Sequence, residues 1–363
     1  MRILLDCRMA TWSGVGRYST GLVRALAGQP GLELVQFVAM GAEPPVPTAE
    51  AVVASAHPFG LRGALEFGSV VRAVRPDITH ALHFPTPVPA PRPLVVTMQD
   101  VTPLAEPAVM PSALKRAVYR GWVARAVRVA DRILASSANT ARDISRFFPE
   151  AAGKTDVVLL AADDFTSQPV GVLPRWLEGR RYVLAMGNTK PHKDLPSLLW
   201  AFGRLTEPDL TLVLAGEDPG GYVRSVLGDS AWAKRVSFTG AVDDGTLRAL
   251  FAGAVALAYP SRYEGFGLPP LEAMAYGVPV VTTTAASVPE VVGDAALLVE
   301  PGDAAALADA LHRVLTDSDL ASRLTTAGRE RASGFTWAKT AQRTADAYAR
   351  VGGEGAGMAE PSP

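Results

Sequence analysis

Short apolar runs alternate along this chain with longer stretches of helical periodicity. In the first half the runs are residues 2–6, 32–39, 93–98, 131–137 and 156–161, and in the second half 181–187, 210–216, 235–240, 255–261, 279–283 and 295–299. Continuous apolar strands separated by helices are typical of parallel sheets that are covered on both faces. The pattern therefore predicts an α/β protein made of two successive doubly wound units.

A polar, proline-containing stretch without periodicity divides the two series of strands. It predicts a first domain over residues 1–165, a linker over 166–180 and a second domain over 181–334. Residues 335–351 have helical character and could pack on either domain, and the Gly-rich tail 352–363 is expected to be disordered. The proline-rich stretches 41–50 and 84–93 are predicted to be loops.

Composition narrows the class of protein. Hydrophobic residues make up 48% and charged residues 20%, as in ordinary globular proteins, and a net charge of −1 argues against a nucleic-acid partner. A single cysteine, Cys7, excludes an intrachain disulfide and fits a reducing compartment. No apolar run reaches the roughly 18 residues of a membrane span, and Asp6 and Arg8 interrupt the apolar start. We therefore expect a cytoplasmic protein.

Two polar segments follow strands in the first half. Gly14 and Gly16 come after strand 2–6, in a turn that precedes a helix expected near Tyr18, and such a turn can aim backbone N–H groups at an anion. Gln99 and Asp100 follow strand 93–98, at the sheet edge where such folds bind ligands. Plain turns are the structural alternative at both places.

The segment 111–134 reads as a basic amphipathic helix. Leu114, Val118 and Trp122 share one face, and arginines and lysines occupy the others. The helix could rest on an anionic membrane. A domain helix with a solvated basic side is the alternative.

Two lysines follow the first strand of the second half. Lys190 and Lys193 precede a helix, where a diphosphate would need positive charge, although lysines there can also simply face solvent. Further on, Ser287 and Glu290 have the spacing of a capping box.

The stretch SRYEGFGLPPLE, residues 261–272, follows the buried strand 255–261. Pro270 suits a first helical turn, which would place Glu272 near the positive end of the helix dipole. That interaction does not account for Glu264, which precedes a loop with Gly265 and Gly267. Glycines allow close backbone approach, and carboxylates accept hydrogen bonds from sugar hydroxyls. The stretch predicts a site for a ligand that is both a phosphate and a polyol.

With these residues in view, the sequence resembles the retaining glycosyltransferases of family 4, and within them the mannosyltransferase-B-like group. The resemblance is carried by SGVGRY, TMQDVTPL, ADRILASS, GNTKPHKDLPSLLWAF, SFTGAVDDGTLRALFAGA, RYEGFGLPPLEAMAYGVPVV and SVPEVVGDAALLVEPGD. It implies a GT-B fold, with two Rossmann-like domains facing a central cleft and the C-terminal helix 335–351 crossing back to complete the first domain. It also implies transfer of a hexose, with mannose from GDP-mannose favoured, to an acceptor hydroxyl.

The resemblance also implies roles for particular residues. Glu264 matches a glutamate beside the transferred sugar, with Gln99 and Asp100 as further catalytic candidates, and Glu272 matches one that holds the ribose. The donor-binding positions are Gly16, Asn188, Lys190, Lys193, Thr239, Gly240, Val242, Gly265, Phe266, Gly267 and Leu268. Gln99 stands where the family usually has histidine, and glutamine cannot transfer a proton at neutral pH. Asn188 stands near a family arginine, for which Lys190 could compensate.

No metal site or cofactor is expected, because neither an Asp-x-Asp motif nor a His/Cys cluster suggests one. The expected partners are the nucleotide sugar and a glycan, lipid-linked or small-molecule acceptor, with peripheral membrane contact through 111–134. Three alternatives stay open: a glycoside hydrolase with two carboxylates, a non-catalytic or regulatory sugar-nucleotide-binding protein, and a nucleotide-sugar epimerase of the same fold.

Overall fold

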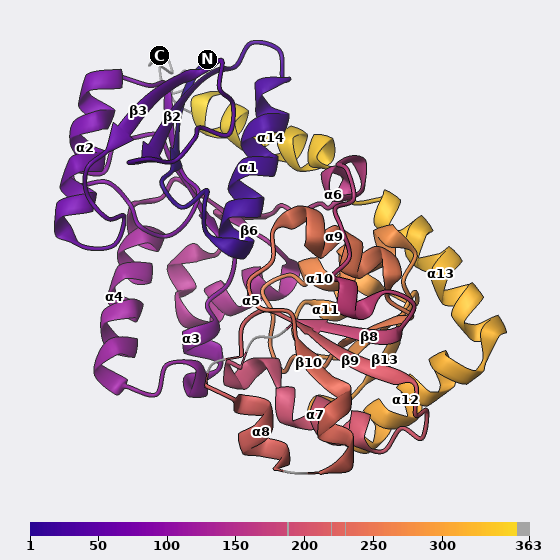
Figure 1. The fold of residues 1–363 in the computed structure, drawn as a ribbon. Coiled ribbons are helices and arrows are strands. Elements are labelled where there is room, and N and C mark those ends of the chain that lie inside the picture. The colour runs from indigo at the N-terminus through magenta and orange to yellow at the C-terminus, as the bar shows by residue number, and fades with distance from the viewer. Residues whose placement is uncertain (187–188, 219, 229, 354–363) are drawn as a thin grey trace, which may run out of the picture. The chain divides into compact units, whose positions relative to one another are not determined.

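The computed structural model describes residues 1–186, 189–218, 220–228 and 230–353 of the chain. It divides into two compact units, one formed by Met1–Ala161 with the chain from Thr336 onward, the other by Ala162–Phe335. Each unit is built on its own parallel sheet (Figure 1). From residue 354 on, the tail predicted to be disordered lies outside the described residues.

The first sheet has the strand order β3-β2-β1-β4-β5-β6-β7, and every pairing is parallel. The chain runs from β1 out to β3 and then returns to β4 on the other side of β1. This reversal makes the β1/β4 position the topological switch point, where ligands of such sheets bind at the carboxyl ends of the strands. The strands are β1 (Arg2–Cys7), β2 (Glu33–Ala39), β3 (Glu50–Ala54), β4 (Ile78–Ala81), β5 (Leu94–Met98), β6 (Arg132–Ala135) and β7 (Thr155–Val157).

The second sheet repeats the plan with the parallel order β10-β9-β8-β11-β12-β13. Its switch point lies between β8 and β11, the two strands at its centre. The strands are β8 (Arg181–Met186), β9 (Leu210–Ala215), β10 (Val236–Phe238), β11 (Ala256–Tyr259), β12 (Val280–Thr283) and β13 (Leu297–Val299). All six match predicted apolar runs.

Helices connect the strands in both units. In the first unit they are α1 (Ser13–Ala27), α2 (Leu61–Val74), α3 (Thr102–Ala105), α4 (Ala113–Val129), α5 (Ala138–Phe147) and α14 (Trp337–Gly353), with short 3-10 turns η1 (Pro107–Val109) and η2 (Pro149–Ala151). In the second they are α6 (Asp163–Ser167), α7 (Leu195–Gly203), α8 (Tyr222–Leu227), α9 (Asp244–Gly253), α10 (Leu268–Tyr276), α11 (Val288–Val292), α12 (Ala304–Thr316) and α13 (Ser318–Ser333), with η3 (Arg175–Leu177), η4 (Pro191–Lys193) and η5 (Ala231–Arg235).

The C-terminal helix α14 belongs to the first unit and lies beside α1 (Figure 1). A Cβ added to Gly21 of α1 would lie 2.2 Å from the ring of Trp337, so only glycine allows this close approach. Farther along α14, the Tyr348 hydroxyl bonds Nδ1 of His80 on β4 at 2.6 Å. The predicted return of the C-terminal helix to the first domain is therefore confirmed.

Several predicted boundaries are wrong. Helix α1 begins at Ser13 rather than near Tyr18, so Gly14 and Gly16 lie in its first turns. The helix within 111–134 ends at Val129, and β7 is shorter than the predicted strand 156–161. Strands β3 and β4 were not predicted, because β3 is largely exposed and β4 carries Thr79 and His80 among its apolar residues.

The segment 166–180, predicted as a linker, lies inside the second unit. Leu177 is fully buried there, and the Gly171 N–H donates to the Gly245 carbonyl at 3.0 Å. The division between the units falls earlier, between Ala161 and Ala162.

Candidate active site

An ion pair occupies the switch point of the second sheet. Lys193 ends the 3-10 turn that follows β8, and Glu264 lies in the loop that follows β11. Because β8 and β11 are paired neighbours, the two loops leave the sheet side by side, and Lys193 Nζ lies 2.6 Å from Glu264 Oε1. Two of the predicted site residues, far apart in sequence, are thus brought into direct contact.

The pair is well shielded from water. The side chains of Lys193 and Glu264 are 17% and 13% exposed. Burial by itself raises the pKa of Glu264, but the Lys193 ammonium and its hydrogen bond outweigh that penalty, so the pKa falls below its usual value. Burial likewise opposes the charge of Lys193, yet Tyr259 and Glu264 together raise its pKa. Both groups are charged at neutral pH.

Tyr259, the last residue of β11, completes the group. Lys193 Nζ donates to the Tyr259 hydroxyl at 3.1 Å and lies 5.3 Å from the ring centroid, within cation–π range. An ammonium carries three N–H donors, and Glu264 and Tyr259 occupy two of them. Tyr259 was missed from the sequence because it reads as one more apolar residue of a buried strand.

Hydroxyl groups at the end of β12 and in the segment after it hold the loop that carries Glu264 in place. Ser287 Oγ lies 2.8 Å from the Glu264 carbonyl and 2.9 Å from the Phe266 carbonyl, and donates to this pair of oxygens. The capping-box interpretation of Ser287 is wrong in its bonding, because the side chain makes no cap bond to α11. Thr283 Oγ1 donates to the Ser261 carbonyl at 2.5 Å, at the start of the same loop. These bonds fix the backbone from which Glu264 projects.

The turn that carries Lys193 is held in a conformation that is uncommon outside glycine. Asp194 has φ 48° and ψ 43°, in the left-handed region, and is buried. The Asp194 carboxylate lies 2.9 Å from Nε of Arg262. The backbone N–H of Arg262 donates to the His192 carbonyl at 2.7 Å. Backbone strain of this kind persists where surrounding contacts enforce it, often at functional sites. The contacts with Arg262 tie the β8 and β11 loops together.

Helix α10 starts earlier than predicted. Its N-cap is Gly267, at φ 113°, and Leu268 is its first residue, so Glu272 is the fifth helical residue and lies beyond the first turn. The helix-dipole explanation of Glu272 is therefore weakened, because that effect fades after the first turn. Glu272 is only 3% exposed. A buried carboxylate is costly unless it is partnered, so Glu272 is not a solvent-facing residue of this helix.

The other predicted donor-binding positions of this unit are distributed around the same sheet edge. Gly265 and Phe266 lie in the β11 loop, where the Phe266 ring packs edge-on against Phe335 at 6.0 Å between centroids. Thr239, Gly240 and Val242 follow β10, two strands away from β8. Lys190 is exposed at the N-cap of its turn. Asn188 lies outside the described residues.

The remaining predicted residues belong to the first unit. Gly16 fits a purely structural role, since an added Cβ would lie 2.3 Å from the Ala10 carbonyl oxygen. Gln99 and Asp100 follow β5, and the backbone of Gln99 accepts hydrogen bonds from Ser136 Oγ and Thr140 Oγ1 at 2.5 and 3.2 Å. Asp100 accepts from the Thr102 N–H at 2.8 Å, as the alternative of a turn-forming residue requires.

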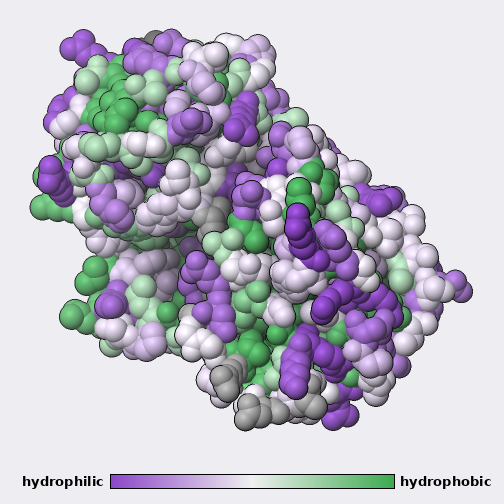
Figure 2. Space-filling model, in the orientation of Figure 1, coloured by the Kyte–Doolittle hydropathy of each residue, from purple (hydrophilic) through white to green (hydrophobic). Residues whose placement is uncertain are grey.

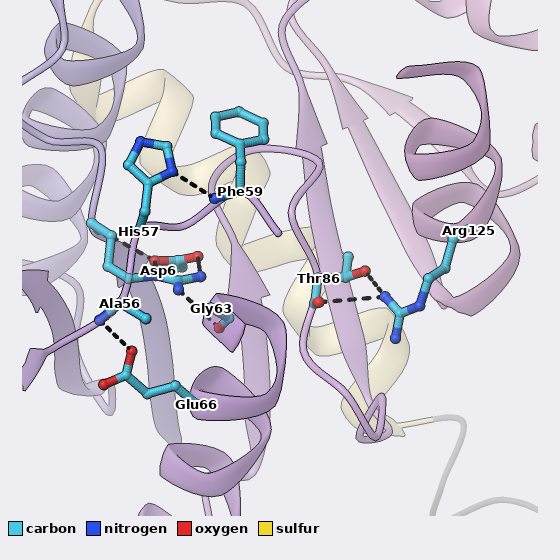
Figure 3. A network of polar contacts seen from close by, with 9 residues as sticks. Asp6, Ala56, His57, Phe59, Gly63, Glu66, Thr86 and Arg125 are labelled. Carbon is cyan, nitrogen blue, oxygen red and sulfur yellow. Dashed lines mark hydrogen bonds and ion pairs between the residues drawn. The ribbon is translucent and has the colours of Figure 1, made fainter. Parts of the chain in front are cut away.

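A buried ion pair lies at the end of β1. Arg8 donates to both oxygens of Asp6 at 2.8 and 2.7 Å, with each side chain 1% exposed, and its guanidinium lies over the Phe37 and Phe67 rings. Figure 3 shows Asp6 beneath the rings of His57 and Phe59, which come from the loop before α2. The pair is fully occupied within the protein, so we assign it a structural role.

The expectation that the chain has no Asp-x-Asp motif overlooked residues 317–319, which have this sequence at the start of α13. Asp317 is the N-cap of α13 and accepts from the N–H groups of Asp319 and Leu320 at 3.1 and 2.9 Å. Within the described ranges, no group of three or more histidine, cysteine or acidic residues is placed to hold a metal ion.

Comparisons with known proteins identify the family of this chain. Residues 174–331 match the family model described as glycosyl transferases group 1. The chain is 30% identical to the O-antigen chain mannosyltransferase B of Escherichia coli over 70% of its own length and 69% of that protein. It is 32% identical to the glycogen synthase of Mycobacterium tuberculosis over 76% of its length and 69% of that enzyme.

Solved structures match nearly the whole chain. A sucrose-phosphate synthase from Thermosynechococcus elongatus superposes with a TM-score of 0.76 at 22% identity, covering 98% of this chain and all of that one. The Anabaena protein HepE in complex with UDP-glucose superposes with a TM-score of 0.74 at 20% identity, covering 96% of this chain and all of that one.

Two parallel, doubly wound sheets in this order define a protein of the GT-B fold. This chain belongs to the glycosyl transferases of group 1, and it is a glycosyltransferase. Among its described residues, no helix has the length and apolar character needed to cross a membrane.

Proposed function

We propose that this glycosyltransferase moves a hexose, with mannose favoured, from a nucleotide diphosphate sugar to an acceptor hydroxyl with retention of configuration. The observation that carries the proposal is the Lys193–Glu264 contact at the β8/β11 switch point. The pair offers one charged group to each half of such a donor. Lysine can bind the diphosphate, and the carboxylate can accept hydrogen bonds from the sugar hydroxyls.

The geometry supports a division of labour within this site. The third N–H of Lys193 is directed to the diphosphate, where it neutralises charge that develops on the leaving group. Glu264 accepts hydrogen bonds from the transferred sugar, and Gly267 together with the first turn of α10 presents backbone N–H groups to the phosphates. Glu272 binds the ribose hydroxyls, with residues 239–242 near the base.

Retention fits a front-face transfer. The bond between the anomeric carbon and the phosphate oxygen breaks, the acceptor oxygen forms its bond on the same face, and the leaving phosphate takes the acceptor proton. No side-chain base is needed in this step, which is compatible with Gln99. Preorganised donors replace the charge stabilisation that a metal ion would otherwise supply, so we propose that the transfer is metal-independent.

Mannose and GDP are favoured by relatives that carry mannosyltransferase names. Besides the Escherichia coli protein, the MMP alpha-(1->4)-mannosyltransferase of Mycolicibacterium hassiacum is 34% identical over 64% of this chain and 58% of that enzyme. A uridine nucleotide is the competing donor, because HepE has been solved with UDP-glucose.

Helix α4 supports a peripheral membrane contact for the acceptor side. Leu114 and Val118 are 75% and 54% exposed, whereas the buried residues of this helix are Val123, Ala126 and Val127. Figure 2 shows apolar side chains standing out from the surface over α4. Lys115 and Arg120 are exposed beside them. Apolar side chains flanked by cations suit an anionic lipid surface.

A screen of sugar nucleotides followed by a transfer assay tests the proposal. A ligand that binds only the native state raises its apparent stability, so the cognate donor should raise the Tm. With that donor, the wild type should release nucleoside diphosphate only when an acceptor is present. Glu264→Gln should lower kcat by about a hundredfold or more, as removal of a preorganised polar group in an active site does.

Glu207→Gln is the matched control. The Glu207 side chain is 14% exposed and lies 3.2 Å from His312, so it resembles Glu264 in burial and pairing but lies away from the β8/β11 edge. Its kcat should stay within twofold of the wild type. An equal loss of kcat in Glu207→Gln and Glu264→Gln, or no loss in Glu264→Gln, would contradict the assignment of Glu264 to the active site. Acceptor-independent release of free sugar would favour a hydrolase, and tight binding without turnover a regulatory protein.

A further inference from the structure

The first unit contains two histidines, His80 and His83, whose buried ring nitrogens differ in one respect. His80 on β4 has partners for both ring nitrogens, the Tyr348 hydroxyl at 2.6 Å and Thr97 Oγ1 at 2.9 Å. His83 lies just beyond the end of β4, and its buried Nδ1 has no hydrogen-bond partner among the described residues. An unsatisfied buried polar group costs about 1–3 kcal/mol, so its retention needs an explanation.

A second unsatisfied group lies at the same edge of the sheet. The Nε2 amide of Gln99, just beyond β5, is also buried and without a partner in the described part of the chain. Strands β4 and β5 are hydrogen-bonded neighbours, so both side chains lie at the carboxyl edge beside the β1/β4 switch point. The Gln99 backbone is fixed by Ser136 and Thr140, which limits how far its amide can move away.

The imidazole of His83 is neutral. Burial lowers its pKa to about 4, although the carboxylates of Asp100 and Asp6 act in the opposite direction. A neutral imidazole has one donor and one acceptor nitrogen, and the Gln99 amide nitrogen is a donor. A sugar hydroxyl both donates and accepts hydrogen bonds without carrying charge, so the two side chains suit a hydroxylated ligand rather than an anion.

Aromatic rings extend from His83 to the surface. The Phe59 ring stands edge-on to His83 at 6.2 Å between centroids, and Trp12 stacks on Phe59 at 5.7 Å. His57 lies 5.9 Å from Trp12, and Figure 3 shows its ring beside that of Phe59. Trp12 is 39% exposed, an unusual position for so large an apolar side chain. Ligand sites combine such aromatic surfaces with a few polar groups that fix orientation.

We propose that His83 and Gln99 bind hydroxyl groups of a pyranose ring on the acceptor, which packs against Trp12, His57 and Phe59. The inference rests on the proposed function and narrows its acceptor to a carbohydrate, as opposed to an apolar alcohol. His83 and Gln99 determine which arrangement of hydroxyl groups can bind, and the aromatic rings pack against the apolar C–H face of the sugar.

Saturation-transfer NMR on the intact chain tests this, with methyl α-D-mannopyranoside, methyl α-D-glucopyranoside and methyl β-D-galactopyranoside as probes. At least one glycoside should bind the wild type. His83→Leu and Gln99→Leu should each weaken it about tenfold, and Trp12→Ala by a comparable factor. His312→Leu, which changes an exposed histidine of the second unit, should leave binding unchanged.

Stability separates this role from a structural one. His83→Leu removes an unsatisfied polar atom, so its Tm should equal or exceed that of the wild type while glycoside binding falls. Absence of binding by all three glycosides, or equal binding by wild type and His83→Leu, overturns the proposal. Binding of UDP and GDP is measured in parallel, so a failure on the donor side is recognised separately from a failure of this acceptor site.

Discussion

The two units place different kinds of polar group at the carboxyl edge of their sheets. In the second unit, Lys193, Glu264 and Tyr259 bond one another across the β8/β11 switch point. In the first unit, the buried Nδ1 of His83 and Nε2 of Gln99 have no partner within the described ranges.

The difference has a physical meaning. Charged groups cannot be left buried alone, so a site for a charged donor keeps its charges paired until the ligand arrives. Neutral amides and imidazoles cost less when unpaired, so a site for a neutral sugar can keep them open. This contrast fits the proposals that the second unit binds a nucleotide diphosphate and the first unit a carbohydrate.

Removing the Ser287 hydroxyl, which holds the loop that carries Glu264, should have the largest effect on kcat. In Ser287→Ala, the Glu264 and Phe266 carbonyls lose their shared donor and the loop shifts, and misplacement of about 1 Å can cost roughly a hundredfold in rate. We expect kcat to fall about that much in the transfer assay. Thr284→Ala, an exposed neighbour, is the control and should retain the wild-type kcat.

His80 and His83 should respond differently to the same substitution. His80→Leu leaves the buried Tyr348 hydroxyl without its partner, while Thr97 Oγ1 keeps its bond to the Tyr18 hydroxyl, so urea unfolding should show a loss of about 1–3 kcal/mol. His83→Leu strands nothing that the structure describes, and its unfolding free energy should stay within about 0.5 kcal/mol. Equal losses would mean that His83 is as integral to the core as His80.

A smaller effect is expected at Glu272. If this buried carboxylate holds the ribose, Glu272→Gln should weaken binding of the nucleoside diphosphate about tenfold, as loss of a charge-assisted hydrogen bond does. Calorimetric titration measures the change. An unchanged Kd would assign Glu272 to the packing of α10 alone.

The smallest effect is the pH dependence of the Lys193–Glu264 pair. The pKa of Glu264 is lowered in the folded state, so its contribution to stability is present above about pH 4.5 and is lost as the pH falls through the folded-state pKa. The pKa of Lys193 is raised in the folded state, so its contribution to stability is present below about pH 10.5 and is lost as the pH rises through the higher folded-state pKa. In urea unfolding, the stabilities of wild type and Glu264→Gln should differ most near pH 7 and converge as the pH falls through the lowered folded-state pKa of Glu264, whereas a constant difference would show that the charge does not stabilise the fold.

The sequence predicts the second sheet well and the first less well, for a physical reason. The strands of the second sheet are short apolar runs, whereas β4 is missed because Thr79 and His80 interrupt its apolar character. Both side chains are buried, and His80 is satisfied by Tyr348, which lies 268 residues away in sequence. Local periodicity cannot reveal a polar residue whose partner comes from a distant helix.

The contacts within the candidate site also could not be predicted from local sequence patterns. Lys193 and Glu264 are each predicted from their positions after strands, but their contact depends on the pairing of β8 with β11. Ser287 matches a local capping motif, yet its hydroxyl bonds a loop more than twenty residues earlier. Similarly, periodicity groups Leu114 with Val118 on α4 but cannot tell that this face is exposed rather than buried.

The account depends most on the claim that Lys193 binds the diphosphate of the donor. Calorimetric titration of UDP and GDP into wild type, Lys193→Met and Lys234→Ala tests it directly, since Lys234 is an exposed lysine of the same unit and serves as the control. We expect one of the nucleotides to bind wild type and Lys234→Ala equally well, and Lys193→Met at least tenfold more weakly. Equal affinity of all three proteins for that nucleotide would contradict the assignment of the donor site.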